Sequence, residues 1–235
     1  MPTLLTPKLD LLWPALLSTR HSLQQTFEEP LAAPFWSAAD ESYRSFKLRF
    51  MLVGRATSGP YDADEFLNQL KKSSADALME RKTLNRWCIG HIRKTSPFWR
   101  SFVTGSKCCG VAEAFENAVW SNLAKVGFAK PKKDVNTDLF RQQEELAENT
   151  LRAELDVYRP TVVHFAVGTL GGECIYRATG TTRRDWEPLA KDGALNDIWF
   201  LNSGKLKAIW TRHPNFAKKE LVDAWTAKLR ELVEA

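Results

Sequence analysis

The sequence has few cysteines and histidines, and their spacing does not suit a metal site. The four cysteines are Cys88, Cys108, Cys109 and Cys174, and they contain no C-x-x-C pair. This argues against a zinc knuckle and against an iron–sulfur cluster. The four histidines show no spacing typical of metal ligands. We therefore expect reduced thiols, no metal ion and no cofactor.

The sequence also lacks long apolar runs. No window approaches about 18 uninterrupted apolar residues, the length that a membrane span requires. The first residues carry Lys8 and Asp10, are broken by Pro7 and Pro14, and lack a leading basic segment, a pattern that is not typical of a signal peptide. We therefore predict no membrane association and a cytoplasmic location.

The composition is that of one folded domain. The chain has 235 residues, 44% of them hydrophobic, and nine tryptophans, enough to bury a sizeable core. We predict a single monomeric domain over residues 1–235, with residues 1–46 forming a helical segment packed on it. The net charge of +5 and the pI near 9.0 suit a phosphate-bearing partner, or an ordinary basic surface.

Apolar strand patterns alternate with helical patterns along the chain. Strands are predicted over Lys47–Val53, Ala118–Leu123, Thr161–Gly168, Ile198–Leu201 and Leu206–Trp210. Helices are predicted over Asp62–Lys72, Pro97–Val103, Val111–Glu116, Thr137–Tyr158, Leu170–Arg177 and Ala217–Val233. This alternation predicts an α/β protein with three layers, α/β/α, around a central, mostly parallel four-stranded sheet.

Polar residues follow three of the predicted strands. The loop after the first strand is Gly54, Arg55, Ala56, Thr57, Ser58 and Gly59; Ser121-Asn122 ends the second; and Arg212-His213-Pro214-Asn215 follows the last. Because the carboxyl ends of parallel strands meet at one edge of a sheet, we expect these three segments to share a pocket.

The residue types at these strand ends suit a polar ring and an anion. Backbone N–H groups of a small-residue loop can face an anion. The amide of Asn122 offers a donor and an acceptor to one ring edge, His213 can carry a proton near neutral pH, and Arg212 suits phosphate. Each has a structural alternative: Asn122 ties down a loop, His213 caps the sheet, and Asn215 caps the following helix. His164, inside an apolar strand, is predicted to be a core residue.

Four phrases resemble the motifs of the uracil-DNA glycosylase superfamily. They are Leu52–Ala56, Trp120–Val126, Arg159–Gly168 and Thr211–Asn215, in the superfamily's order, within a resemblance that covers residues 47–233. The first motif, Gly-Arg-Ala-x-x-Gly, is similar to that of an uncharacterised branch. The resemblance implies the superfamily's α/β fold, DNA as the partner, and DNA repair by a hydrolase, a glycosidase that removes a base.

The resemblance also implies roles for individual residues. The loop Gly54–Ser58 would surround a flipped base, and Asn122 would read its edge. His213 would stabilise the charge on the departing base. The superfamily's water-activating residue stands in the loop itself, where this chain has Arg55, so Asp62 or Asp64 a little further on would substitute for it and place the water. The residues that would contact DNA are Arg212, Asn215, Phe216 and Lys218. Phe216 is a candidate wedge between bases, or a first-turn residue packed on the core.

Arg55 departs from the superfamily, in which several branches carry an acid or an asparagine in this loop. A guanidinium stays protonated and cannot act as a base toward water. Two functions therefore remain open: an N-glycosylase acting on a damaged or deaminated base, and a nucleotide- or nucleic-acid-binding protein without that chemistry. A third alternative, a hydrolase with Thr57 or Ser58 as nucleophile, lacks the G-x-S-x-G turn.

Overall fold

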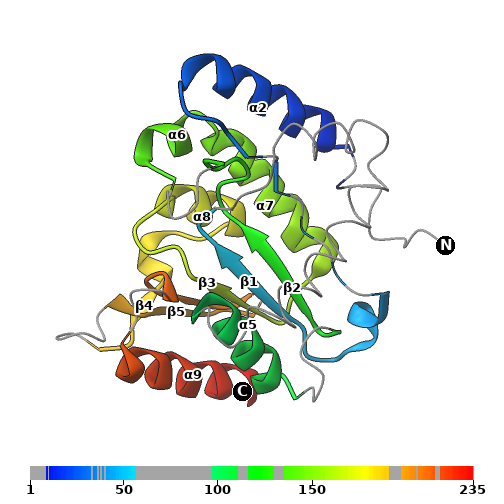
Figure 1. Cartoon of the computed structure of the whole chain (residues 1–235). Helices are drawn as coiled ribbons and strands as arrows, with labels where there is room; N and C mark the ends of the chain where they lie inside the picture. The colour runs from blue at the N-terminus through cyan, green and yellow to red at the C-terminus, as the bar shows by residue number, and fades with distance from the viewer. Residues whose placement is uncertain are drawn as a thin grey trace.

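The structure is a computed structural model that describes most of the chain. The described residues are 9, 11–32, 34–35, 37, 39, 41–56, 97–110, 116–129, 135–190, 197–204, 206–214 and 218–234. Within them, helices cover both faces of one β-sheet, which confirms the predicted α/β class (Figure 1). No helix in these ranges is long and apolar enough to cross a membrane.

The sheet of the described residues has six strands. They are β1 (Phe50–Gly54), β2 (Ala118–Asn122), β3 (Val162–Phe165), β4 (Glu187–Pro188), β5 (Trp199–Asn202) and β6 (Lys207–Trp210). Their order across the sheet is β2-β1-β3-β6-β5-β4. The strands β2, β1, β3 and β6 run parallel, whereas β5 is antiparallel to β6 and β4 is antiparallel to β5.

The prediction of a four-stranded sheet is therefore wrong at one edge. The strands β5 and β6 were both expected, and they pair through a short turn, from Trp199 opposite Trp210 to Asn202 opposite Lys207. The outermost strand, β4, has two residues and ends in Pro188. Two residues are too few to show an alternating pattern. Proline has no backbone N–H to donate, and it is tolerated on an edge strand because its outer side does not take part in the ladder of hydrogen bonds.

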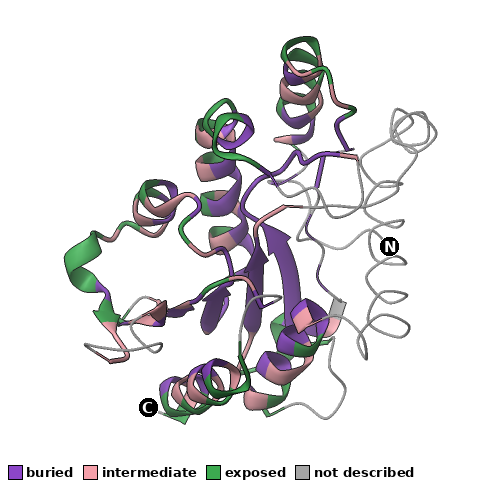
Figure 2. Cartoon of the chain, turned by 60° about the vertical axis from the view of Figure 1, so that its left-hand side comes forward, coloured by how far each residue is buried: buried purple, intermediate pink, exposed green. Residues whose placement is uncertain are grey.

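Every residue of β1, β2 and β3 is buried, as the purple strands of Figure 2 show. Successive side chains of a strand point to opposite faces of the sheet. Met51 and Val53 therefore join the core on one face, and Phe50 and Leu52 join the core on the other. A strand covered on both faces needs apolar residues at every position, which explains its uninterrupted apolar sequence.

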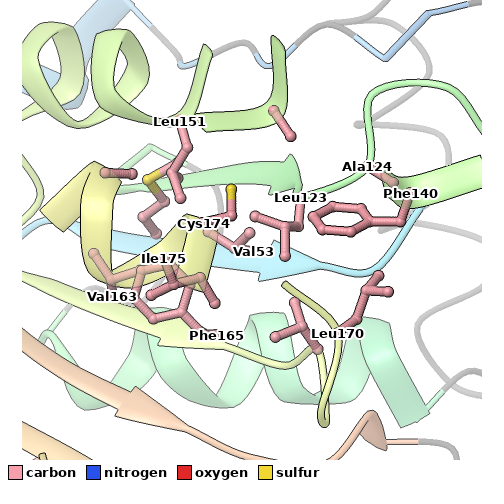
Figure 3. Close-up of a cluster of buried hydrophobic side chains, with 14 of the residues drawn as sticks. Val53, Leu123, Ala124, Phe140, Leu151, Val163, Phe165, Leu170, Cys174 and Ile175 are labelled. Atoms are coloured by element: carbon pink, nitrogen blue, oxygen red, sulfur yellow. The ribbon is translucent and has the colours of Figure 1, made fainter. Parts of the chain in front are cut away.

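One face of the sheet is covered by α7 (Glu144–Tyr158) and α8 (Gly172–Thr179), which contact each other. Figure 3 shows the core beneath them, where Leu151 of α7 and Ile175 of α8 gather with Val163 of β3. The α8 helix carries its buried side chains on one stripe, as expected for a helix on a sheet.

An N-terminal helix extends this core. Leu16 and Leu23 of α2 (Trp13–Thr26) are buried in the same cluster. The Arg20 guanidinium donates to the Leu31 carbonyl at 2.9 Å, which connects the helix to the segment that follows it.

The single helix predicted over residues 137–158 is two helices, α6 (Thr137–Arg141) and α7. The buried Gln143 lies just before α7. Its side-chain oxygen accepts from the Val126 N–H at 2.8 Å, and its nitrogen donates to the Val126 carbonyl at 2.8 Å. The helical spacing of the apolar residues continues across the break, so the sequence pattern does not distinguish two helices from one.

The opposite face is covered by α5 (Pro97–Cys108) and α9 (Lys219–Glu234), which also contact each other. The helix predicted to end before Gly105 in fact continues through it. A Cβ atom at Gly105 would lie 2.2 Å from Cζ of Phe50 on β1, so the glycine marks a close approach of helix to sheet.

Substitution Gly105→Ala is expected to destabilise the protein by about 1–3 kcal/mol, because the new methyl group overlaps the Phe50 ring. Alanine is otherwise favoured over glycine inside a helix by about 1 kcal/mol. Urea unfolding measures the change, and adding Phe50→Leu is expected to restore part of the loss. An alanine variant more stable than the parent would show that the helix is not held this close.

Candidate functional site

The carboxyl ends of β1 and β2 lie side by side. Gly54 is opposite Asn122 in the parallel register, and the Leu123 N–H donates to the Gly54 carbonyl at 2.8 Å. A Cβ atom at Gly54 would lie 2.7 Å from Oδ1 of Asn122 and 2.8 Å from Cε2 of Phe98. Only glycine leaves room here for both the amide and the aromatic ring.

Phe98 connects this corner to the end of β6. Its ring is nearly parallel to the imidazole of His213, with an interplanar angle of 11° and centroids 5.9 Å apart. It also contacts Trp120 edge-on, with centroids 5.9 Å apart. The structure thus brings Gly54, Asn122 and His213 to one edge of the sheet, with Phe98 between them. We call these four residues the ring site.

Asn122 is held in a fixed orientation. Its side chain is buried, and its Oδ1 accepts from the indole Nε1 of Trp120 at 3.1 Å. The amide is therefore oriented before any ligand arrives.

Hydrogen bonds between β3 and β6 position the segment that carries His213. The Thr211 N–H donates to the Phe165 carbonyl at 2.8 Å, and the Gly168 N–H donates to the Thr211 carbonyl at 2.9 Å. Arg212 and His213 follow directly, the first exposed and the second half-buried. The Arg212 guanidinium forms an ion pair with Asp197 at 2.7 Å. A phosphate bound by Arg212 would therefore share the guanidinium with the Asp197 carboxylate.

The remaining predicted residues fall into two groups. Arg55 and Ala56 are half-buried after β1, and Lys218 is exposed just before α9. Six predicted residues lie outside the described ones, so their positions stay predictions: Thr57, Ser58, Asp62, Asp64, Asn215 and Phe216.

A cavity of about 450 Å³ opens beside the ring site. It is lined by Arg55, Gly168, Thr169, Tyr176, Arg183, Trp186, Asp197, Trp199, Trp210, Thr211, Arg212 and His213. The sequence predictions included Arg55, Arg212 and His213 but missed the aromatic residues. One signal could have found two of them: Trp199 and Trp210 stand on consecutive predicted strands and face each other across the β5–β6 pair.

Histidine 164 lies beneath the site, in the core, as predicted. Its Nε2 is 2.8 Å from Oγ1 of Thr211, which itself donates to the Arg212 carbonyl at 2.9 Å. Because the hydroxyl has one proton, Nε2 must be the donor to it. Burial lowers the pKa of His164 to about 3, so the imidazole is neutral. The ring also packs on Trp225 of α9, with centroids 4.6 Å apart.

A buried ion pair supports the end of β2. The Lys125 ammonium lies 2.8 Å from Oε1 of Glu154, and both side chains have at most 1% of their surface exposed. The Ser121 hydroxyl donates to Glu154 at 2.7 Å and accepts from Lys125 at 2.8 Å. Burial lowers the pKa of Lys125, while the adjacent Glu154 acts in the opposite direction. The network ties the residue before Asn122 to α7.

The described residues contain no group of three or more histidine, cysteine or acidic side chains placed to hold a metal ion. Cys108, Cys109 and Cys174 are free thiols.

No family model and no curated protein sequence matches this chain. Its function is therefore inferred from the geometry of the site.

Substitution Glu154→Ala is expected to destabilise the protein by about 3–5 kcal/mol, because it leaves the buried Lys125 ammonium without its counter-charge. Replacing both Lys125 and Glu154 by leucine should cost less, since no buried charge remains. Urea unfolding measures both, with Lys219→Ala, which breaks an exposed pair, as the control that should leave the midpoint unchanged. If the double leucine variant were less stable to urea than Glu154→Ala, the loss in Glu154→Ala could not be attributed to an unpaired buried charge on Lys125.

The stability of the protein is expected to fall with acidification because of His164. In the unfolded chain, His164 takes up a proton below its ordinary pKa of 6.5. In the folded protein the pKa of His164 is about 3, so the imidazole stays neutral to a much lower pH. Stability is therefore complete above the unfolded pKa and is lost as the pH falls through this window, by about 2 kcal/mol between about pH 7 and about pH 5. Comparing unfolding of the parent with His164→Gln isolates the effect. An equally steep loss in the variant would assign it to other groups.

Proposed function

We propose that this protein binds nucleic acid at the carboxyl edge of its parallel strands and hydrolyses the N-glycosidic bond of a damaged or deaminated base. One observation carries the proposal: the Phe98 ring stacks on His213 and lies against Gly54 beside the amide of Asn122. A stacking ring, an oriented amide and an imidazole are the groups that a flipped base needs.

Each residue of the ring site has a chemical role in this proposal. Phe98 stacks with the base, and the amide of Asn122 pairs with its polar edge. A water oxygen attacks C1′ of the sugar and loses one proton to the carboxylate that places it. The bond from C1′ to the base nitrogen breaks, and its electron pair stays with the base. The imidazole of His213 stabilises the resulting anion or supplies its proton.

Residues outside the ring site would place the attacking water and contact the phosphates of the strand. Asp62 or Asp64 would place the attacking water. Arg212, Lys218 and the lysines at positions 130, 132 and 133 would contact phosphates. Contacts of this kind release counterions, so affinity for DNA should fall steeply with salt concentration.

The resemblance to the uracil-DNA glycosylase superfamily supports the proposal. The strands of the four resembling phrases are neighbours in the parallel part of the sheet, in the order β2-β1-β3-β6. The residues Gly54, Asn122 and His213, which match the superfamily's motifs, are at the same edge. We infer a uracil-DNA glycosylase-like fold that carries an additional antiparallel edge, β5 and β4.

The proposal predicts that oligonucleotides containing uracil, hypoxanthine or an oxidised base acquire alkali-sensitive abasic sites. His213→Ala and Asn122→Ala should each lower the single-turnover rate about 100-fold or more, because each removes a group that binds the base or its developing charge. The matched controls are His21→Ala, an exposed residue of the N-terminal helix α2, and Asn202→Ala, an exposed residue opposite Lys207 at the start of β6. Full turnover by either site variant would refute the assignment.

Arg55 favours a second candidate function, the binding of a nucleotide or nucleic acid without catalysis. It lines the cavity together with Arg183 and Arg212. Guanidinium groups remain protonated and suit anions, not the activation of water. Binding of every tested oligonucleotide without any abasic site would favour this candidate.

A further inference from the structure

The cavity beside the ring site has walls of aromatic carbon. We call Tyr176, Trp186, Trp199 and Trp210, together with Arg183, the aromatic cavity. The indole N–H of Trp210 donates to the Gly168 carbonyl at 2.6 Å, and that of Trp186 donates to Oγ1 of Thr181 at 3.1 Å. Because these donors are already used, the two rings offer a ligand apolar surface alone.

The aromatic walls are also held rigidly. Trp186 meets Trp210 edge to face at 84°, with centroids 5.6 Å apart, and Tyr176 contacts Trp210 at 5.7 Å. Trp199 lies opposite Trp210 on the antiparallel strands and is half-buried. A preformed aromatic wall binds planar rings without paying much conformational entropy.

The charges around the cavity select an anion. Arg183, an exposed residue, holds its guanidinium 5.8 Å from the centroid of the Trp199 ring, and Arg55 and Arg212 line the cavity with it. Among the described residues that line it, Asp197 is the one carboxylate, and it is bonded to Arg212. A cationic ligand for an aromatic cage is therefore disfavoured.

We propose that the aromatic cavity binds a nucleotide, with its base against the tryptophans and its phosphate at Arg183 and Arg55. The volume of about 450 Å³ falls within the range of small-molecule sites, roughly 300–1,000 Å³. His213 lines the cavity and also stacks on Phe98, so the cavity and the ring site adjoin.

Two sources could supply this nucleotide: a free nucleoside monophosphate, or the neighbouring nucleotide of a strand whose target base occupies the ring site. The second source rests on the proposed function. The first rests on the second candidate function, nucleotide binding without catalysis, and needs the aromatic cavity alone.

The test measures binding of deoxythymidine monophosphate, of a short single-stranded oligothymidylate and of ribose 5-phosphate by calorimetry. Trp199→Ala should weaken binding of the base-containing probe about tenfold or more, and Trp199→Phe should keep most of it. Arg183→Gln should weaken binding several-fold. The matched control is Arg184→Gln, which changes the next exposed residue of the same turn and does not line the cavity.

The outcomes separate the two sources and the two proposals. Binding of the monophosphate that depends on Trp199 and Arg183 supports a free nucleotide, and dependence seen with the oligonucleotide alone supports a strand. Ribose 5-phosphate binding as tightly as the nucleotide, or variants that bind like the parent, would overturn the inference. Abasic sites formed equally by parent and Trp199→Ala would overturn a strand as the source of the nucleotide while leaving the proposed function intact. Nucleotide binding that depends on Trp199 and Arg183, with no abasic sites formed, would support the aromatic cavity as a nucleotide site and contradict the proposed glycosylase function.

Discussion

The parallel pairing of β1 with both neighbours determines where the candidate residues lie. Gly54 faces Asn122 across one pair, and β3 on the other side connects β1 to β6. Because parallel strands end at the same edge, the loops after β1, β2 and β6 converge there. Hydrogen bonds to Thr211 hold the third loop, and the buried pair of Lys125 and Glu154 holds the second. The ring site thus depends on sheet register more than on any single contact within it.

Much of the sheet could be predicted from the sequence, because a strand buried on both faces has an apolar residue at almost every position. The bounds of helices and the outer edge could not. The helix α6 ends just before Gln143, which bonds the distant Val126, and α5 continues through Gly105, which lies against the ring of Phe50. Local spacing carries no information about either contact. The two-residue β4 is stabilised by pairing with β5, not by its own pattern.

The site shows the same division between local and long-range information. Gly54, Asn122 and His213 end predicted strands, so topology alone predicted that they meet. Whether Phe98 lies near the site could not be decided from the sequence, because nothing in its helix pattern says which way the first turn of α5 faces. The aromatic cavity was missed because its walls come from α8, the segment before β4, and the β5–β6 pair. Such a wall exists only after the antiparallel edge has formed.

The ring site and the aromatic cavity meet at His213, so a single strand can test the proposed ligands of both sites in one experiment. The most direct measurement is a crystal structure of the protein with a short single strand that carries a non-cleavable analogue of deoxyuridine. We expect the base of the analogue to stack on the Phe98 ring and its polar edge to hydrogen-bond the amide of Asn122. The base nitrogen that is bonded to C1′ of the sugar should lie near His213. A strand bound at another surface, or a base held away from Phe98 and Asn122, would contradict this assignment.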